Sequence, residues 1–492
     1  MSSTDEKKDK PTTEETKADS KDWFKEEAPV ATRHEITIGG KTLAYTAHAG
    51  KLPIRNEKGE TEAAIFFMAY TLDTEGPRQD RPLMFAFNGG PGSSSVWLHF
   101  GAIGPKRAAL NPDGTLPPPP YRPVDNEFTW LENADLVFID PVGTGYSRAK
   151  DEETAKKFYG IEPDIKCLAE FIRLYLTRYE RWGSPLFLAG ESYGTTRGAG
   201  LAGHLINEGI AFTGILLVST VLNFQTLVFS TGNDLPYSLF LPSFAATAWY
   251  HRRLPEDLQS RPLPEVLKEV EAFAEGEYVL ALMRGDRLSE SDRDHLAAKL
   301  ARYTGLSERY VRLSQFRLRI HAFCKELLRD DGLIVGRFDS RITGRGGSGT
   351  GENMEYDPSG AVIRPPYTAA FNDYIRRELD YREDLPYTIL GGLYSQWDWG
   401  KGNTFADTGA ALRSAIEKNP HLRVFVASGY YDLATPYAAA DYTFAHLGID
   451  PSLRGNIEVA YYEAGHMMYI ESGSMVKLKR DVDDFLRRTA GG

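Results

Sequence analysis

Short apolar runs alternate with amphipathic stretches through the first 220 residues of the chain and again near its end. The runs expected to form buried strands in the first part lie at 82–87, 134–140, 185–189 and 214–218. Between them, residues 162–181 and 195–208 repeat their apolar positions with helical spacing. Strands that alternate with helices in this way favour a mostly parallel sheet flanked by helices.

This rhythm stops in the middle of the chain. Residues 221–385 are rich in helical stretches, and buried-type strands resume only at 422–427 and 457–462. We therefore predict one sheet domain built from two parts, residues 31–220 and 386–492, with residues 221–385 inserted between them as a helical cap.

The first 30 residues differ from the rest. Residues 1–30 are rich in charged and small polar side chains and predict a disordered tail. They contain no apolar segment typical of a signal peptide, and no apolar run in the chain approaches the roughly 18 residues of a membrane helix. We therefore expect a cytoplasmic protein. A periplasmic or secreted protein whose signal peptide has been removed is the alternative.

Composition narrows the class of function. Of the 492 residues, 42% are hydrophobic and 25% are charged, as in an ordinary globular protein. The formal net charge of −11 argues against a nucleic-acid-binding surface. The only two cysteines, Cys167 and Cys324, lie in helix-like segments and are expected to be buried thiols. Their number excludes a disulfide framework and leaves a single bridge open.

The sequence shows no binding motif for a metal or a nucleotide. No group of histidines or cysteines has metal-site spacing, and no Gly-x-Gly-x-x-Gly follows a strand. The Gly-rich segment at 344–351 lacks the Gly-Lys-Ser/Thr ending of a phosphate loop and predicts a mobile loop. We therefore expect no metal and no other cofactor.

The most informative motif directly follows the run at 185–189. Gly-Glu-Ser-Tyr-Gly at 190–194 matches the G-x-S-x-G nucleophile elbow of the α/β-hydrolases. Glycines two positions before and after the serine permit a sharp strand-to-helix turn, which exposes the serine hydroxyl above the sheet. We predict an α/β-hydrolase fold with Ser192 as the nucleophile.

A serine nucleophile needs a base to accept its proton and an acid to orient that base. In α/β-hydrolases the chain order is serine, acid and then histidine, and the last two lie on loops after late strands. Asp432 follows the strand at 422–427, and His466 follows the strand at 457–462. We predict that these residues and Ser192 form a catalytic triad.

The tetrahedral intermediate of such a reaction needs backbone N–H donors for its oxyanion. The residue after the nucleophile supplies one donor, so we expect the N–H of Tyr193. The loop at 88–92, Asn-Gly-Gly-Pro-Gly, follows an early strand and is the candidate for the second donor. Its glycines allow the backbone to approach a substrate closely.

Four blocks of the chain make it resemble one known family. They are Asn-Gly-Gly-Pro-Gly-Ser-Ser-Ser at 88–95, Asp-Pro-Val-Gly-Thr-Gly-Tyr-Ser at 140–147, Gly-Glu-Ser-Tyr-Gly at 190–194, and the turns around Asp432 and His466. Together they resemble the serine carboxypeptidases, the peptidase S10 family.

The resemblance implies roles for the matching positions. It implies that the triad consists of Ser192, Asp432 and His466. It also implies that Gly90 and Tyr193 donate the oxyanion N–H groups, and that Asn88 and Glu191 bind the substrate's C-terminal carboxylate. Two neighbouring carboxylates repel each other unless they share a proton. Glu191 should therefore be protonated when substrate binds, so binding should favour acidic pH.

Two positions depart from the family pattern. The family usually has a glutamate near a Leu-Gly-Pro, whereas this chain has Ala102 within Phe-Gly-Ala-Ile-Gly-Pro at 100–105. Ser93 replaces a common cysteine, and the absence of the disulfide cysteines found in plant and fungal secreted members indicates a bacterial-type member. Met467 follows the base, where it either lines the leaving-residue pocket or serves packing.

We therefore expect a serine carboxypeptidase that releases C-terminal amino acids through an acyl-enzyme. An esterase or acyltransferase with the same triad is the alternative, because the carboxylate-binding network lacks an acid at Ala102. A catalytically inactive binding module is a second rival, against which the intact triad argues. We expect a peptide substrate as the partner, no nucleic acid and no membrane, and we leave a homodimer open.

Overall fold

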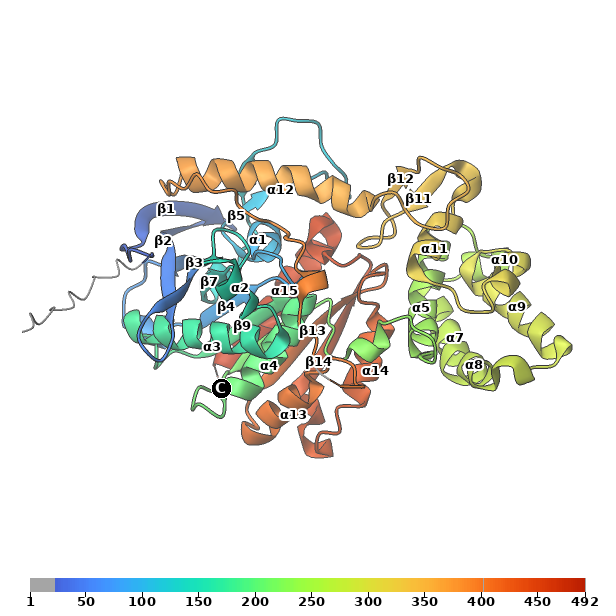
Figure 1. The fold of residues 1–492 in the computed structure, drawn as a ribbon. Helices are drawn as coiled ribbons and strands as arrows, with labels where there is room; N and C mark the ends of the chain where they lie inside the picture. Colours follow the sequence, from blue (N-terminus) through green and yellow to red (C-terminus); the bar gives the residue numbers. More distant parts are fainter. Residues whose placement is uncertain (1–22, 401, 492) are drawn as a thin grey trace, which may run out of the picture.

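The computed structural model describes residues 23–400 and 402–491 (Figure 1). Most of the predicted tail, residues 1–22, lies outside this range. The described residues form one ten-stranded sheet in the order β1-β2-β3-β7-β4-β9-β10-β13-β14, with β8 paired to β3. Its strands are β1 (Val30–Ile38), β2 (Lys41–Arg55), β3 (Thr61–Leu72), β4 (Leu83–Phe87), β7 (Asp135–Ile139), β8 (Arg148–Ala149), β9 (Leu186–Glu191), β10 (Gly214–Val218), β13 (Arg423–Gly429) and β14 (Ile457–Tyr462).

The sheet is mostly parallel, as predicted. From β7 to β14 every pair of neighbours is parallel, whereas β1, β2 and β3 form an antiparallel meander that joins β7 at its antiparallel edge. The predicted strands appear with their ends displaced by at most two residues. The α/β-hydrolase fold is therefore confirmed, and the carboxyl ends of the central strands share one edge of the sheet.

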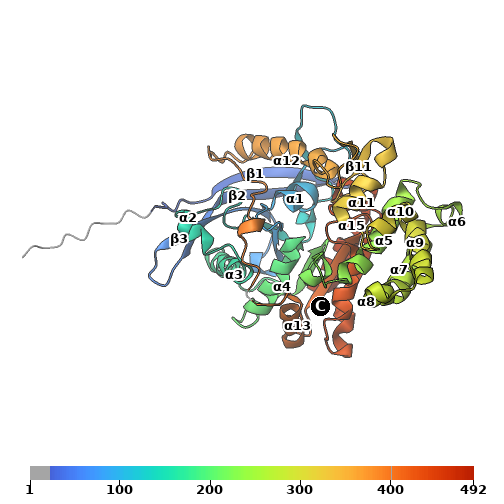
Figure 2. The same ribbon diagram turned by 45° about the vertical axis from the view of Figure 1, so that its right-hand side comes forward.

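Helices cover both faces of the sheet (Figures 1 and 2). The helices concerned are α3 (Ile161–Arg178), α4 (Tyr193–Leu205) and α13 (Gly409–Lys418) on one face, and α12 (Pro358–Arg377) and α15 (Ser472–Ala490) on the other. In α3 the buried residues Ile165, Leu168, Ile172 and Leu176 recur every three or four positions. This spacing aligns them on the side that packs against the sheet.

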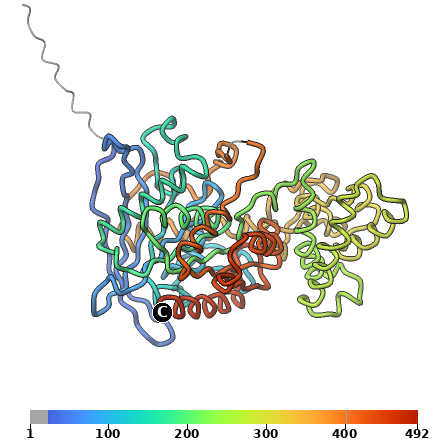
Figure 3. Tube along the Cα trace, turned by 90° about the horizontal axis from the view of Figure 1, so that it is seen from below, coloured from blue at the N-terminus to red at the C-terminus, as the bar shows by residue number. Residues whose placement is uncertain are grey.

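The inserted segment contains a second helical body beside the sheet domain (Figures 1 and 3). It has an apolar core of its own. Its elements are α5 (Leu235–Tyr250), α6 (Glu256–Gln259), α7 (Leu263–Phe273), α8 (Val279–Arg284), α9 (Glu290–Thr304), α10 (Glu308–Leu313), α11 (Ile320–Glu326) and the hairpin of β11 (Leu333–Val335) and β12 (Thr343–Arg345).

Helix α12 leaves this body and returns over the sheet domain (Figure 1). Phe371 and Tyr374 of α12 lie in the same apolar core as the sheet and α15. The inserted segment therefore contributes to both bodies, and the predicted domain boundaries at 221 and 385 stay predictions. The remaining elements are α1 (Val96–Leu98), α2 (Glu152–Lys156), α14 (Tyr437–Ala445), β5 (Lys106–Ala108) and β6 (Pro123–Asp125).

None of the helices in residues 23–400 and 402–491 is both long and apolar enough to span a membrane.

The helix that follows the elbow is held by a close contact with α13. A Cβ atom added to Gly203 of α4 would lie 2.7 Å from the backbone oxygen of Ala411 and 2.8 Å from its Cβ. Only glycine leaves room for this approach, since real Cβ atoms do not pack at such distances. The position of α4, and of the serine at its start, therefore depends on a small residue at this contact.

We predict that Gly203→Ala lowers the free energy of unfolding by about 1–3 kcal/mol, because the added methyl group overpacks the contact between α4 and α13. Gly276→Ala is the matched control, since nothing lies within 4 Å of the added Cβ there. It should leave stability unchanged or raise it slightly. Urea denaturation followed by circular dichroism compares the two variants, and equal effects would contradict this account of the contact.

Candidate active site

The predicted nucleophile elbow lies at the junction of β9 and α4. β9 ends at Glu191 and α4 begins at Tyr193, so Ser192 alone makes the turn. Its backbone has φ 60° and ψ −130°, a combination that residues other than glycine rarely adopt. The Ser192 N–H donates to the oxygen of Val218 in the neighbouring strand, at 3.0 Å. The turn is therefore strained and held by the sheet.

The two glycines of the motif are required by backbone packing. A Cβ atom at Gly190 would lie 2.3 Å from the oxygen of Gly194, and one at Gly194 would lie 2.9 Å from the oxygen of Phe87. The strand and the helix thus pass each other with no space for side chains. This packing explains why small residues flank the serine at both positions.

Asp432 and His466 come together on the loops after β13 and β14. The Nδ1 atom of His466 lies 2.7 Å from Oδ2 of Asp432. The buried Asp432 carboxylate also accepts hydrogen bonds from the backbone N–H groups of Ala434 and Thr435 and from the Thr435 hydroxyl, at 2.7, 2.9 and 2.8 Å. These bonds fix the carboxylate, which in turn orients the imidazole.

The position of the His466 ring is set from two more sides. Its backbone N–H donates to the oxygen of Phe338 at 2.6 Å, and its own oxygen accepts from the Ser219 hydroxyl at 2.6 Å. Burial lowers the pKa of His466, but the attraction of the Asp432 carboxylate outweighs it, so the pKa is raised from its ordinary value. The neutral imidazole, which can accept a proton from serine, therefore gains population as pH rises.

The glycine loop packs directly against the start of α4. A Cβ atom at Gly89 would lie 2.4 Å from the backbone nitrogen of Tyr193. Gly90 has a φ of 104°, which favours glycine, and it lines the same cavity as Ser192. The structure thus brings together the two segments predicted to supply the oxyanion donors.

The second motif, at 140–147, holds this loop in place. The buried Asp140 accepts hydrogen bonds from both the N–H and the hydroxyl of Ser95, each at 2.8 Å. Ser93 N–H closes the loop by donating to the oxygen of Gly89 at 3.0 Å. Asp140 therefore acts on the loop as an anchor rather than as a reacting group.

The predicted carboxylate-binding pair is also assembled. The Asn88 side-chain amide donates to Oε1 of Glu191 at 3.1 Å, and its oxygen accepts from the N–H of Leu98 at 3.0 Å. Glu191 is only 3% exposed. Burial raises the pKa of Glu191 to about 7, although His466, Tyr469 and Asn88 act in the opposite direction. This carboxyl group is therefore protonated through the acidic range.

Tyr469 is a member of this network that the sequence motifs did not predict. Its hydroxyl donates a hydrogen bond to Oε2 of Glu191. The Tyr469 ring packs against Gly101: a Cβ atom added to Gly101 would lie 2.2 Å from Cε2 of Tyr469. The next residue is Ala102, at the position where an acid was expected from the resemblance. A phenol thus reaches the Glu191 carboxyl from the turn after His466. The tyrosine three residues after the predicted base was the only signal in the sequence.

One cavity of about 430 Å³ joins these groups. Of the predicted residues, those that line it are Asn88, Gly90, Glu191, Ser192 and His466. Met467 lines it as well, whereas Asp432 lies fully buried behind His466. A nucleophile, its base and a protonated carboxyl therefore face the same space. Such a cavity can hold a peptide end with its last bond at the serine.

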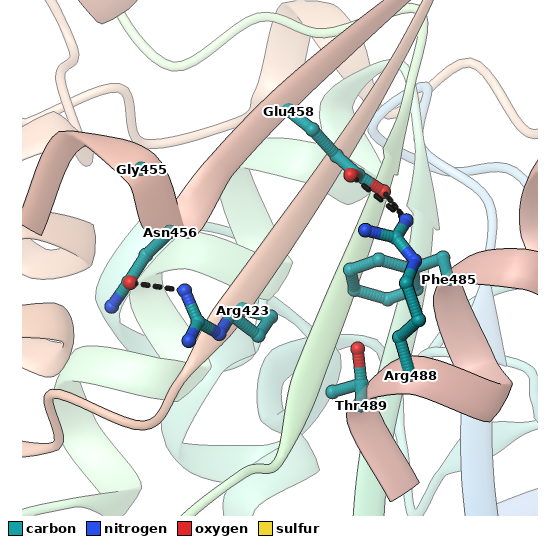
Figure 4. A pocket seen from close by; sticks show the side chains of 7 residues that line it. All are labelled: Arg423, Gly455, Asn456, Glu458, Phe485, Arg488 and Thr489. Carbon is teal, nitrogen blue, oxygen red and sulfur yellow. Dashed lines mark hydrogen bonds and ion pairs between the residues drawn. The ribbon is translucent and has the colours of Figure 1, made fainter. Parts of the chain in front are cut away.

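A second hollow lies away from these residues. Figure 4 shows it between Arg423, at the start of β13, and the C-terminal helix α15. Its polar side chains pair with each other, Arg488 with Glu458 and Arg423 with Asn456. None of the predicted site residues lines it. It faces the amino ends of β13 and β14, at the opposite edge from the triad.

The described part of the chain contains no group of three or more His, Cys, Asp or Glu side chains placed to hold a metal ion. Cys167 and Cys324 are buried and free, so the single bridge left open by the sequence is not formed.

Comparison with known proteins shows what one segment of the chain is similar to. Residues 39–236 match the family described as serine carboxypeptidase, over about two fifths of the chain. This segment is therefore similar to the serine carboxypeptidases, the peptidase S10 family. It includes Asn88, Gly90, Glu191, Ser192 and Tyr193, whereas Asp432 and His466 lie beyond it.

Related proteins come from yeast and from a plant. The pheromone-processing carboxypeptidase KEX1 of Saccharomyces cerevisiae is 34% identical over 157 residues, which cover 30% of this chain and 20% of that protein. Serine carboxypeptidase-like 8 of Arabidopsis thaliana is 27% identical over 243 residues, covering 47% of this chain and 52% of that protein. The chain thus matches from a fifth to about half of these relatives' lengths.

The crystal structure of a prohormone-processing carboxypeptidase, Kex1(delta)p from Saccharomyces cerevisiae, has the same fold. It superposes with a TM-score of 0.57 at 17% identity, covering 89% of this chain and 91% of that one. The shared fold therefore extends well beyond the segment in which the sequences match.

We predict that a serine-reactive phosphonate forms one covalent adduct, at Ser192. Asp432→Asn should slow labelling by about 10³–10⁴-fold, because the imidazole loses the partner that orients it. Asp441→Asn is the matched control, since Asp441 is a half-buried acid that accepts a hydrogen bond from Tyr461 and lies outside the cavity. Mass spectrometry of the labelled peptides reads the result. An adduct elsewhere, or equal rates in both variants, would contradict the triad.

Proposed function

We propose that this protein is a serine carboxypeptidase that releases C-terminal amino acids from peptides through an acyl-enzyme. One observation carries the proposal: the buried, hydrogen-bonded Asn88 and Glu191 line the same cavity as Ser192 and His466. A triad alone would suit any acyl transfer. A protonated carboxyl beside the triad suits a substrate with a free carboxylate at its end.

In the proposed reaction Ser192 attacks the carbonyl of the last peptide bond. His466 accepts the serine proton and passes it to the nitrogen of the departing amino acid, while Asp432 stabilises the imidazolium. Water then enters, and the same base activates it to hydrolyse the acyl-enzyme. The N–H groups of Gly90 and Tyr193 stabilise the oxyanion of both tetrahedral intermediates.

Recognition of the substrate carboxylate falls to Glu191 and Asn88. Below a pH of about 7 the Glu191 carboxyl is neutral and can donate its proton to the substrate carboxylate. Above that pH it is ionised and repels the substrate. Tyr469 supports this site by donating to the other oxygen of Glu191, which supplies a polar partner although position 102 carries no acid.

We predict that an N-blocked dipeptide with a free C-terminal carboxylate is cleaved at least tenfold faster than its C-terminal amide at pH 5, in kcat/KM. The preference arises because the ionised carboxylate accepts a stronger, charge-assisted hydrogen bond from protonated Glu191 than the amide oxygen does, and it should shrink at pH 7.5. Ser192→Ala, expected to be inactive, is the control. Equal cleavage of acid and amide, or activity on ester analogues alone, would favour the esterase or acyltransferase alternative.

We predict that Glu191→Gln flattens the dependence of KM on pH. In the unmodified enzyme KM should rise by about tenfold per pH unit above 7, as Glu191 ionises. Glutamine stays neutral and should remove this rise, which moves the optimum of kcat/KM toward neutral pH. Asp441→Asn serves again as the control for removing a half-buried acid. Steady-state kinetics from pH 5 to 8.5 measure the effect, and an unchanged KM profile would exclude Glu191 from carboxylate binding.

Three further expectations stay predictions. The bacterial-type form rests on the absence of the disulfide cysteines from the sequence, and the comparisons do not support it, since the relatives named above come from yeast and Arabidopsis. The cytoplasmic location rests on the sequence alone, and the homodimer is left open.

A further inference from the structure

Two arginines line the cavity of the triad without a charged partner. Arg337 and Arg364 both face the cavity that contains Ser192 and His466. Within residues 23–400 and 402–491, neither guanidinium makes an ion pair or a side-chain hydrogen bond, and Arg337 only packs over the ring of Phe338. Arg364 is exposed and Arg337 half-buried.

Other arginines in enclosed positions of this protein are paired. The pairs with the most buried guanidinium groups are Arg181–Asp135, Arg197–Asp164 and Arg341–Asp339. In the hollow of Figure 4, Arg488 binds Glu458 and Arg423 binds Asn456. The substrate cavity is thus a place where two positive charges are left for a ligand.

Packing places Arg364 toward the end of the cavity where the leaving residue would lie in the proposed reaction. Arg364 is one helical turn before Tyr367, whose ring lies 5.1 Å from that of Trp97. Trp97 lines the cavity and directly precedes Leu98, which binds Asn88. α12 therefore borders the Asn88–Glu191 end of the cavity.

Arg337 lines the cavity from a different segment, next to the predicted base. It directly precedes Phe338, whose oxygen accepts the His466 N–H and whose ring lies 5.2 Å from the imidazole. The backbone N–H of Arg337 donates at 3.1 Å to Asp357, whose side chain caps the start of α12. This bond links the Arg337 segment to the helix that carries Arg364.

The two arginines are more exposed than the residues proposed to bind the substrate's C-terminal carboxylate. Asn88 and Glu191 are 1% and 3% exposed and lie deep in the site, whereas Arg364 lies at its open side. Among the described residues that line the cavity, Glu191 alone has a carboxyl group, and it is neutral at acidic pH. The two arginines then give the lining a positive charge, although Asp432 lies behind His466 and the whole chain carries −11. Such a lining attracts anions.

We propose that Arg337 and Arg364 bind the side-chain carboxylate of the residue to be released, so that the enzyme prefers peptides ending in Glu or Asp. This inference rests on the proposed carboxypeptidase function and adds its substrate class. The guanidinium group is suited to the role, because its planar fork can donate two parallel hydrogen bonds to one carboxylate. The main-chain carboxylate remains with Asn88 and Glu191.

The test compares N-blocked dipeptides that end in Glu, Gln or Leu, at pH 6 and low ionic strength. Glu and Gln have nearly the same shape, so their ratio isolates the charge. We expect kcat/KM for Glu to exceed that for Gln by at least tenfold. Arg337→Gln and Arg364→Gln should each lower kcat/KM for the Glu peptide by roughly tenfold, as expected for losing a charge-assisted hydrogen bond. They should change kcat/KM for the Gln and Leu peptides by less than twofold.

Arg345→Gln is the matched control. Arg345 ends β12 in the same inserted segment, is exposed, and does not line the cavity. Arg345→Gln removes the same charge and should leave kcat/KM for all three peptides unchanged. Arg337→Lys should recover part of the preference for Glu, because it restores the charge without the fork. Phosphonate labelling at the normal rate verifies that each variant is folded.

The outcomes separate this inference from the proposed function. Cleavage of the Gln and Leu peptides without a preference for Glu would overturn the inference and leave the carboxypeptidase function standing. Equal losses on all three peptides in the arginine variants would also overturn it, since the arginines would then bind a group common to every substrate. Failure to cleave any free-acid dipeptide would overturn both.

Discussion

The site depends on the close approach of backbone segments around Ser192, which glycines make possible. Gly190 lets β9 pass α4, Gly194 lets α4 pass the end of β4, and Gly89 brings the glycine loop against the N–H of Tyr193. The strained backbone of Ser192 costs about 1–3 kcal/mol. Burial of β9 in the centre of the sheet and of α4 against α13 offsets this cost. The catalytic serine is thus positioned by the core of the protein rather than by a flexible loop.

A chain of buried polar contacts continues from this turn to the substrate site. Arg197 of α4 forms a buried ion pair with Asp164 of α3 and donates to the backbone oxygen of Asn88. Asn88 in turn donates to Glu191, whose second oxygen accepts from Tyr469. A helix pair, the glycine loop, a central strand and the turn after the base therefore share one network. Inside a protein such linked bonds rigidify a site, because each group would be costly to leave unpaired.

Two parts of the chain line the cavity. The sheet domain supplies the proposed nucleophile, base and acid together with Glu191. The inserted segment supplies Arg337, Phe338, Ile363 and Arg364 to the lining of the same cavity. In the proposed function, chemistry and selectivity are thus carried by different parts of the chain. An α/β-hydrolase can change its substrate through an insertion while its catalytic turns stay as they are.

The strands, the elbow and the loops that carry Asp432 and His466 were predictable from the sequence. These features are local: a buried strand requires a continuous apolar run, and the sharp turn requires glycines at fixed spacing. Only the tertiary structure decided that Tyr469 meets Glu191, 278 residues away, and that two arginines of the inserted segment border the cavity. No periodicity encodes such contacts, because they depend on how α12 and the late turns pack over the sheet. The same holds for the charge state of Glu191, since burial, rather than the neighbouring sequence, raises its pKa.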